Sequence, residues 1–302
     1  MHRRAEACYS RNCSHNLKTA ATKVLYQEGT KIQWPFLCEI QEPRMKNKTL
    51  LLSTAVMVSI LCLSGPSQAH FGMVIPSDSM VMQKDNKTVT LTLSFSHPFE
   101  GVGMEMLKPK AFGVVVAGEN RNLIGSLQQT QLMGQSAWTA LFPIKRPGLY
   151  VFHMEPEPYW EPAEDAFILH YTKTVVTAFG DDGGWDAEIG LKTEIVPLAK
   201  PYGLYAGNVF QGIVKIDGTP VPHAAVEVEY YNQDGKARAP SEYMITQTIK
   251  ADPNGVFTYA VPAPGWWGFA ALSKADFKLQ HNGEDKDVEI GAVIWVKFHD
   301  WQ

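Results

Sequence analysis

Several stretches of this chain alternate polar and apolar residues with a period of two, and this pattern limits its fold more than any other feature. Residues 88–95, TVTLTLSF, show it most clearly. Because successive side chains of a β-strand point to opposite faces, the alternation predicts a strand with one buried and one solvated face. No segment after residue 70 keeps a helical period over three turns. The sequence therefore predicts an all-β protein built from packed sheets.

The first part of this region predicts one β-sandwich over residues 70–198. Its further strands are expected at residues 111–117, 138–142, 148–152 and 166–178. The second and third of these are expected to pair as a hairpin around residues 144–147. About seven short strands separated by turns are typical of a sandwich.

A second, smaller sandwich is predicted for residues 199–302, after a boundary near residues 197–202. Its strands are expected at residues 209–216, 225–231, 256–261, 268–272 and 291–298. The run DPNG at residues 252–255 is a strong turn signal. The phrases KIDGTPVPHAAVEVEYYN and ADPNGVFTYAVPAPGWWGFAA resemble the Cna-B-like and carboxypeptidase-regulatory-like modules of exported proteins. That resemblance implies an Ig-like fold for this part.

Residues 45–69 have the three parts of a secretory signal peptide. Lys46 and Lys48 precede an apolar run of about fifteen residues, which is too short for a comfortable membrane span. GPSQA then offers a cleavage site after Ala69, so the expected location is periplasmic or otherwise extracytoplasmic. Lipidation at Cys62 is disfavoured because Leu61 stands where a small residue is needed. Residues 1–44 are expected to be a disordered start-site extension, with a genuine N-terminal extension as the alternative.

Cleavage after Ala69 would change the composition of the protein. All four cysteines precede the cut, so the mature chain would contain neither thiol nor disulfide. Of 27 Lys and Arg, nine precede residue 70 and 18 remain; of 31 Asp and Glu, four precede it and 27 remain, which gives a net charge of −9. This charge disfavours nucleic acid and anionic membranes as partners and is compatible with a cation ligand. No second apolar run approaches membrane-spanning length, so no direct membrane insertion is expected after cleavage.

Cleavage would also make His70 the first residue, where its α-amine and imidazole can chelate one metal ion together. Two further histidines lie in unusual segments: His97 in SHPFEG, and His153 in HMEPEPYWEPAED. The last segment contains five carboxylates and two aromatic residues, and a solvated acidic loop is its alternative interpretation. We predict that His70, His97 and His153 bind a metal. The secondary candidates are Glu157, Glu161, Glu164 and His170.

The ligand types indicate which metal is expected. Amine and imidazole nitrogens suit nickel, cobalt, copper and zinc, whereas carboxylates alone would suit calcium or magnesium. Without a thiolate, copper(I) and structural zinc are disfavoured. Nickel or cobalt is therefore the expected ion, and copper or zinc ranks below it. Binding is expected to be weaker at pH 5 than at pH 7.5, because the metal must displace protons from nitrogen.

Four phrases of the mature region carry a resemblance to a known family. AHFGMVIPSDSMV, LSFSHPFEG, YVFHMEPEPYWEPAEDAFILHYTK and PAPGWWG together resemble the NikK-type auxiliary periplasmic component of nickel/cobalt energy-coupling-factor (ECF) transporters. The resemblance covers nearly the whole mature region. It implies an extracytoplasmic metal-binding protein that serves a membrane permease complex. The three ligands named above rest on residue chemistry and not on this resemblance.

The other histidines carry less weight. His170 is expected to be a sheet residue or a partner of a ligand, and His223, His281 and His299 are expected to be solvated. Trp266 and Trp267 are expected to pack between the two sandwiches.

Three functions fit the sequence. The leading one is capture of nickel or cobalt for a transporter, which requires no enzymatic activity. The others are a histidine-brace copper protein or oxidase, and a structural or adhesive two-sandwich protein without metal.

Overall fold

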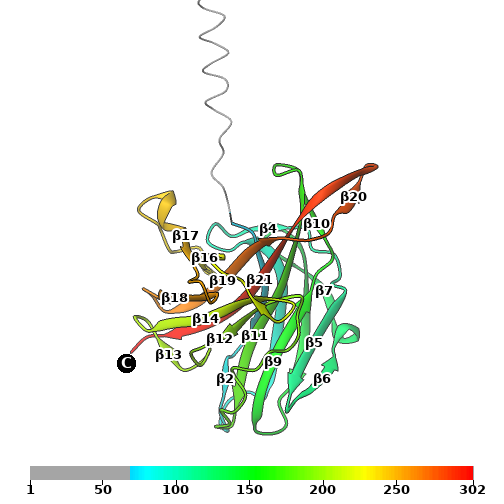
Figure 1. The fold of residues 1–302 in the computed structure, drawn as a ribbon. Coiled ribbons are helices and arrows are strands. Elements are labelled where there is room, and N and C mark those ends of the chain that lie inside the picture. Colours follow the sequence, from blue (N-terminus) through cyan, green and yellow to red (C-terminus); the bar gives the residue numbers. More distant parts are fainter. Residues whose placement is uncertain (1–68, 302) are drawn as a thin grey trace, which may run out of the picture. The chain divides into compact units, whose positions relative to one another are not determined.

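The computed structural model describes residues 69–301, so the predicted extension and all but the last residue of the predicted signal peptide lie outside the described residues. The described part is all-β, as predicted, with two short 3-10 helices and no α-helix (Figure 1). Its elements are β1 (Phe71–Pro76), β2 (Met80–Val81), β3 (Thr88–His97), β4 (Val102–Met104), β5 (Ala111–Val116), β6 (Glu119–Asn122), η1 (Ile124–Ser126), β7 (Gln128–Leu132), β8 (Gln135–Pro143), β9 (Gly148–Glu155), β10 (Tyr159–Glu161), β11 (Ala166–Ala178), β12 (Thr193–Pro197), β13 (Leu204–Tyr205), β14 (Val209–Ile216), β15 (Thr219–Pro220), β16 (Ala225–Tyr230), η2 (Glu242–Met244), β17 (Thr246–Lys250), β18 (Val256–Ala260), β19 (Gly265–Lys274), β20 (Leu279–His281) and β21 (Glu284–His299).

The first half is a sandwich of two facing layers. One layer is the sheet β1-β3-β8-β7, with β4 added to β3; the other contains β11, β9, β5 and β6. The alternation in β3 turns Val89, Leu91 and Leu93 into the core, where they meet Phe152 and other side chains of the opposite layer. The strand predicted at residues 88–95 is confirmed.

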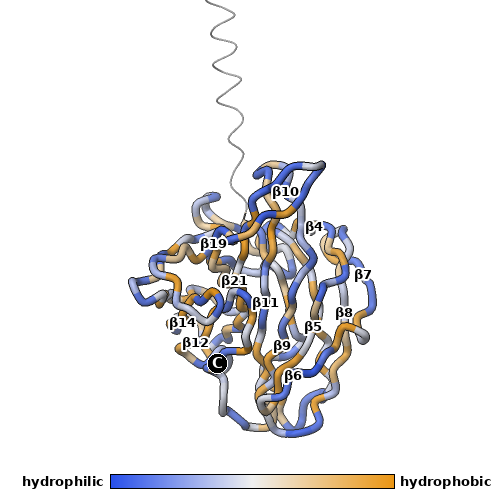
Figure 2. Tube along the Cα trace, turned by 45° about the vertical axis from the view of Figure 1, so that its right-hand side comes forward, coloured by the Kyte–Doolittle hydropathy of each residue, from blue (hydrophilic) through white to orange (hydrophobic). Residues whose placement is uncertain are grey.

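The second half has a core of its own. A small sheet of β12, β14, β15 and β18 packs against β16, β19 and β21, with Phe210, Phe257 and Phe269 at its centre. The predicted turn before β18 is present: the Asp252 carboxylate accepts hydrogen bonds from the backbone of Asn254 and Val256. Figure 2 shows apolar residues recurring along the strands of both halves, with hydrophilic residues prominent in the loops at their ends.

One sheet runs through both halves. Its strand order is β17-β16-β19-β21-β11-β9-β5-β6, and β11 pairs with β21 in parallel from Ala166↔Asp287 to Thr174↔Trp295. A further apolar cluster joins β1 to β19 and β21 through Phe71, Trp266 and Trp295. This cluster, at the junction of the halves, lies directly beside the first residue of the predicted mature chain.

The predicted hairpin of residues 138–152 is wrong. β8 pairs with β3 and β7, whereas β9 pairs with β5 and β11 in the other sheet. The two strands face each other across the core, where the Phe142 ring lies edge-on to Phe152 with centroids 5.2 Å apart. The connection between them therefore crosses from one layer to the other, with Ile144 buried inside it.

Within residues 69–301, no helix is long and apolar enough to cross a membrane.

Candidate functional site

Strand pairing brings His70 and His97 together. β1 and β3 are antiparallel, and Phe71 pairs with Ser96. Extending this register by one residue places His70 opposite His97, at the entry of β1 and the end of β3. Their ring centroids are 4.7 Å apart. Two of the three predicted ligands therefore meet.

A carboxylate on strand β10 determines which ring nitrogen of His70 carries the proton. Nε2 of His70 lies 3.0 Å from Oε2 of Glu161, and both side chains are largely buried. Because a carboxylate only accepts, Nε2 carries the hydrogen and Nδ1 of the neutral ring keeps its lone pair. Burial lowers the pKa of His70 to about 4; His97 and His170 lower it too, while Glu161 opposes the change. His70 is therefore neutral at pH 7, the form that binds metals.

The residue before the predicted cut accepts a hydrogen bond from one ring nitrogen of His97. Its Nδ1 donates to the backbone oxygen of Ala69 at 2.8 Å, and both residues are buried. The Ala69 carbonyl carbon is bonded to the backbone nitrogen of His70. Removal of Ala69 would release the His97 nitrogen and place the new α-amine beside it.

His170 adds a third imidazole, from the middle of β11. It is 2% exposed, and its Nδ1 accepts a hydrogen bond from the Gly72 backbone nitrogen at 3.2 Å. Its Nε2 lies 3.5 Å from Oε1 of Glu289. An added Cβ at Gly291 would lie only 2.5 Å from the His170 ring, so this glycine makes room for the histidine. With both nitrogens engaged, His170 orients its neighbours and does not offer a free lone pair.

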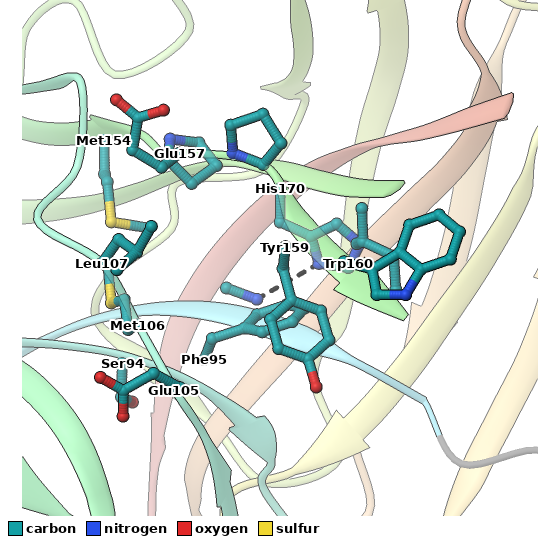
Figure 3. Close-up of a pocket in the computed structure, with 14 residues that line it drawn as sticks. Ser94, Phe95, Glu105, Met106, Leu107, Met154, Glu157, Tyr159, Trp160 and His170 are labelled. Carbon is teal, nitrogen blue, oxygen red and sulfur yellow. Dashed lines mark hydrogen bonds between the residues drawn. The ribbon is translucent and has the colours of Figure 1, made fainter. Parts of the chain in front are cut away.

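A cavity of about 310 Å³, with His170 in its wall, adjoins the histidine cluster (Figure 3). Most of its wall is apolar or aromatic, and Phe95, Tyr159 and His170 belong both to the wall and to the surroundings of the cluster. The Phe95 ring stacks on His70 at 5.8 Å and meets His170 edge-on at 5.6 Å. The site therefore combines a histidine pair with an adjoining pocket.

One family model matches this chain. Its description is "Domain of unknown function (DUF4198)", and it matches residues 67–275, more than half of the chain. The chain belongs to this family. No curated protein matches it.

The likenesses of this DUF4198 chain to solved structures are weak. They include trypsin-activated alpha-2-macroglobulin from Escherichia coli (11% identity, TM-score 0.22), the adhesin InvE from Yersinia pseudotuberculosis (11%, 0.21) and dimeric latent PorU from Porphyromonas gingivalis (12%, 0.20). Each alignment covers 76% of this chain, which spans 16%, 61% and 20% of those chains, respectively. At these TM-scores the likenesses carry no argument about function.

The structure places His153 of the DUF4198 domain away from the histidine pair. Phe152 and Met154 point into the core, so His153 between them points to the other face of the sheet. Its Nε2 lies 3.0 Å from Oδ1 of Asn120. Burial lowers the pKa of His153, and Lys173 lowers it further while Glu194 opposes this.

The three secondary carboxylates lie around the site in different roles. Glu161 contacts His70, and Glu157 lines the cavity. Burial raises the pKa of Glu164, and the nearby Glu289 and Glu161 raise it further while His170 lowers it. All three therefore belong to the surroundings of the site.

Of the remaining histidines, His223 is exposed as expected, whereas His299 is half-buried. His281 is also half-buried. Its ring stacks on Trp160 at 3.8 Å and 11°, which joins β10 to the β20–β21 hairpin. Trp266 packs at the junction of the halves, as predicted, whereas Trp267 belongs to the core of the second half.

Two signals in the sequence pointed to the close packing around His170: the glycines at positions 72 and 291 inside apolar strands.

The donor set fits a metal only with the α-amine included. Among residues 69–301, no group of three or more His, Cys, Asp or Glu side chains has an arrangement that could hold an ion. The amine of a chain cleaved after Ala69, Nδ1 of His70 and one nitrogen of His97 would supply three nitrogen donors. Glu161 would orient His70, as carboxylates commonly do for metal-binding histidines.

Proposed function

We propose that this protein binds nickel or cobalt at an amino-terminal histidine brace and serves a membrane metal-uptake transporter of the ECF type. In this proposal, export and cleavage after Ala69 create the α-amine outside the cytoplasmic membrane. The ligands are the amine and Nδ1 of His70 together with His97. The protein binds and hands over its cargo and catalyses no reaction.

The observation that carries the proposal is the arrangement of His70. Glu161 holds Nε2, and the other ring nitrogen is the one that can close a chelate ring with the amine. His97 stands next to the position of that amine, because it contacts the oxygen of the preceding residue. The transporter association is supported by the sequence resemblance and by the acidic mature chain, which attracts cations.

The test is isothermal titration of a chain that begins at His70 with nickel, cobalt, copper and zinc. We expect nickel or cobalt to bind tighter than about micromolar at pH 7.5. Affinity is expected to fall at pH 5, because an α-amine with an ordinary pKa of about 7.7–8 must lose its proton. One additional residue before His70 should weaken binding by at least about tenfold, because it converts the amine to an amide.

Three histidine variants complete the test. His97→Asn should also weaken nickel binding by at least about tenfold, while His153→Asn, on the other face of the sheet, should not change it. His223→Asn, at an exposed turn with φ 57° that asparagine tolerates, is the matched control. Unchanged affinity in the chain with the extra residue would contradict the brace. Tight copper binding with peroxide-dependent sugar cleavage would instead support an oxidase.

The transport step has its own test. In cells that express the permease and lack this protein, accumulation of radioactive nickel should be restored by the unmodified chain and not by His97→Asn. Equal accumulation with both would contradict a role in uptake.

A further inference from the structure

The cavity beside the histidine pair is far larger than a metal ion requires. Its volume of about 310 Å³ corresponds to roughly ten water molecules at about 30 Å³ each. This is the lower end of the range that small organic ligands occupy. The pocket therefore has the size for a molecule of about ten to fifteen non-hydrogen atoms.

The wall of the cavity indicates what such a molecule is like. Two methionines and an isoleucine together with three aromatic side chains give it a mainly apolar surface: Met106, Met154, Ile168, Phe95, Tyr159 and Trp160 (Figure 3). The charged side chains in the wall are Glu105 and Glu157, and no Lys or Arg contributes to it. An anion would meet two carboxylates without a compensating cation, so the pocket favours a neutral or cationic ligand with a flat apolar body.

The pocket and the histidine pair share their boundary. Phe95 and Tyr159 border both: each lines the pocket, and their rings lie 5.8 Å and 6.4 Å from the His70 ring. The proposed brace supplies three nitrogen donors, whereas square-planar or tetragonal nickel takes at least four ligands. Among residues 69–301 no group of three or more His, Cys, Asp or Glu side chains is arranged to hold an ion by itself. The brace therefore leaves at least one coordination position for a ligand from outside the protein.

We propose that the cargo is a metal complex of a small organic chelator with no negative charge, whose apolar body occupies this pocket. The chelator fills the coordination positions that the protein leaves open, and its rings contact Phe95 and Tyr159. This inference rests on the proposed function, because the metal is held by the same histidine pair.

The test compares four titrants on the chain that begins at His70, which contains every strand described for residues 69–301. They are nickel alone, 2,2′-bipyridine alone, nickel with one equivalent of 2,2′-bipyridine, and nickel with one equivalent of citrate. The cationic bipyridine complex is expected to bind at least about tenfold tighter than nickel alone, a difference of about one logarithmic unit in Kd. The anionic citrate complex and free bipyridine are expected to bind more weakly than the bipyridine complex.

Two leucine variants locate the bound complex. Leu107→Trp places a large ring at the exposed rim of the pocket, where Leu107 is 61% exposed; Leu141→Trp is the matched control at a 67% exposed position on β8. The first variant should lose the tenfold advantage of the complex while binding nickel alone as before. The second should change neither affinity. Thermal unfolding of both variants verifies that they are folded.

The outcomes separate this inference from the proposed function. If nickel alone binds through the amine and the bipyridine complex binds no tighter, or Leu107→Trp does not affect it, the pocket inference is wrong and the metal site stands. If the citrate complex binds as tightly as the bipyridine complex, the charge argument is wrong. If no form of nickel binds, the pocket inference is wrong, and if cobalt does not bind either, the proposed function is wrong too.

Discussion

Glu194 pairs with a lysine at a place where solvent reaches neither charge. Lys173 Nζ lies 2.5 Å from Oε1 of Glu194, with the side chains 2% and 4% exposed. Backbone nitrogens of Ile189 and Gly190 also donate to the Glu194 carboxylate. Burial lowers the pKa of Lys173, and Glu194 opposes that change. Lys173 lies on β11 and Glu194 on β12, so the ion pair joins these two strands. The hydrogen bonds to Glu194 also fix the segment before β12.

Removal of Glu194 should destabilise the fold strongly. Glu194→Ala would leave the Lys173 ammonium buried and unpaired, and we expect the free energy of unfolding to fall by about 3–5 kcal/mol in urea titrations. Asp234→Ala, which breaks the exposed ion pair with Lys236, is the control and should cost far less. Equal losses in the two variants would contradict the structural role of the buried pair.

The sequence predicts the meeting of His70 and His97 but not the place of His153. Their meeting is expected from their chemistry as metal ligands, whereas the pairing of β1 with β3 that brings them together is not encoded in either segment. β9 is apolar on both faces, so its residues give no indication which of His153 and Met154 points inward. The contact between His170 and Gly291 depends on two strands that are distant in the chain, which local periodicity does not encode.

At the scale of elements, aromatic stacking couples the pocket wall to the second half. Trp160 of β10 lines the pocket and stacks on His281 of β20, and Phe167 lies edge-on to Trp160 at 5.1 Å. Lys286 of β21 pairs with Asp165 near the same place. The β20–β21 hairpin thus supports the segment that carries Glu161.

Trp160→Ala should loosen this support locally. Such aromatic contacts contribute about 0.5–1.5 kcal/mol beyond their buried area. We therefore expect amide hydrogen exchange in β10 and β20 to accelerate about three- to tenfold, while β5 exchanges as before. Trp301→Ala, which removes a stack on Tyr205, is the control and should leave β10 unchanged. Unchanged exchange in β10 and β20 of the Trp160 variant would show that the stack does not hold them.

Every strand of eight or more residues overlaps one that the sequence predicts, whereas shorter strands such as β1, β7 and β12, and the strand partners, do not follow from it. The alternation of residues 88–95 and the turn at residues 252–255 are local signals, and the structure confirms both. Whether β8 and β9 pair or face each other depends on where their neighbours lie. Both arrangements bury Phe142 and Phe152, so the pattern of apolar residues does not distinguish them.

At the scale of the whole molecule, buried carboxyl groups make stability depend on pH. Burial raises the pKa of Glu229 to about 8; Glu100 and Glu227 raise it too, while hydrogen bonds from Thr246 and the Phe99 backbone oppose this. Burial also raises the pKa of Glu227 to about 7, and Glu289 and Glu164 raise it further. Both groups retain protons in the folded state at pH values where the unfolded chain has lost them.

The stabilisation that these two protonated carboxyl groups give the folded state should be fully present below about pH 4.5, the ordinary glutamate range. It should be lost as pH rises to about 8. A tenfold difference in proton affinity between the folded and unfolded states corresponds to about 1.4 kcal/mol. The free energy of unfolding should therefore decline by a few kcal/mol between pH 5 and pH 8. Glu229→Gln should make this decline smaller. Urea titrations across that range measure the slope. Glu242→Gln, at an exposed position, is the control, and identical slopes in the two variants would contradict the assignment.

The parallel pairing of β11 with β21 also means that folding cannot finish until the last strand has been synthesised. His170 pairs with Gly291, so a nascent chain presents β11 to its surroundings long before its neighbour has been translated. Contacts between residues so far apart in sequence form slowly, since a long loop must close first. A chain that stopped before β21 would leave the side of β11 that pairs with β21 as an open strand edge, the kind of surface that recruits other chains. Premature termination is therefore expected to yield aggregates and not a folded first half.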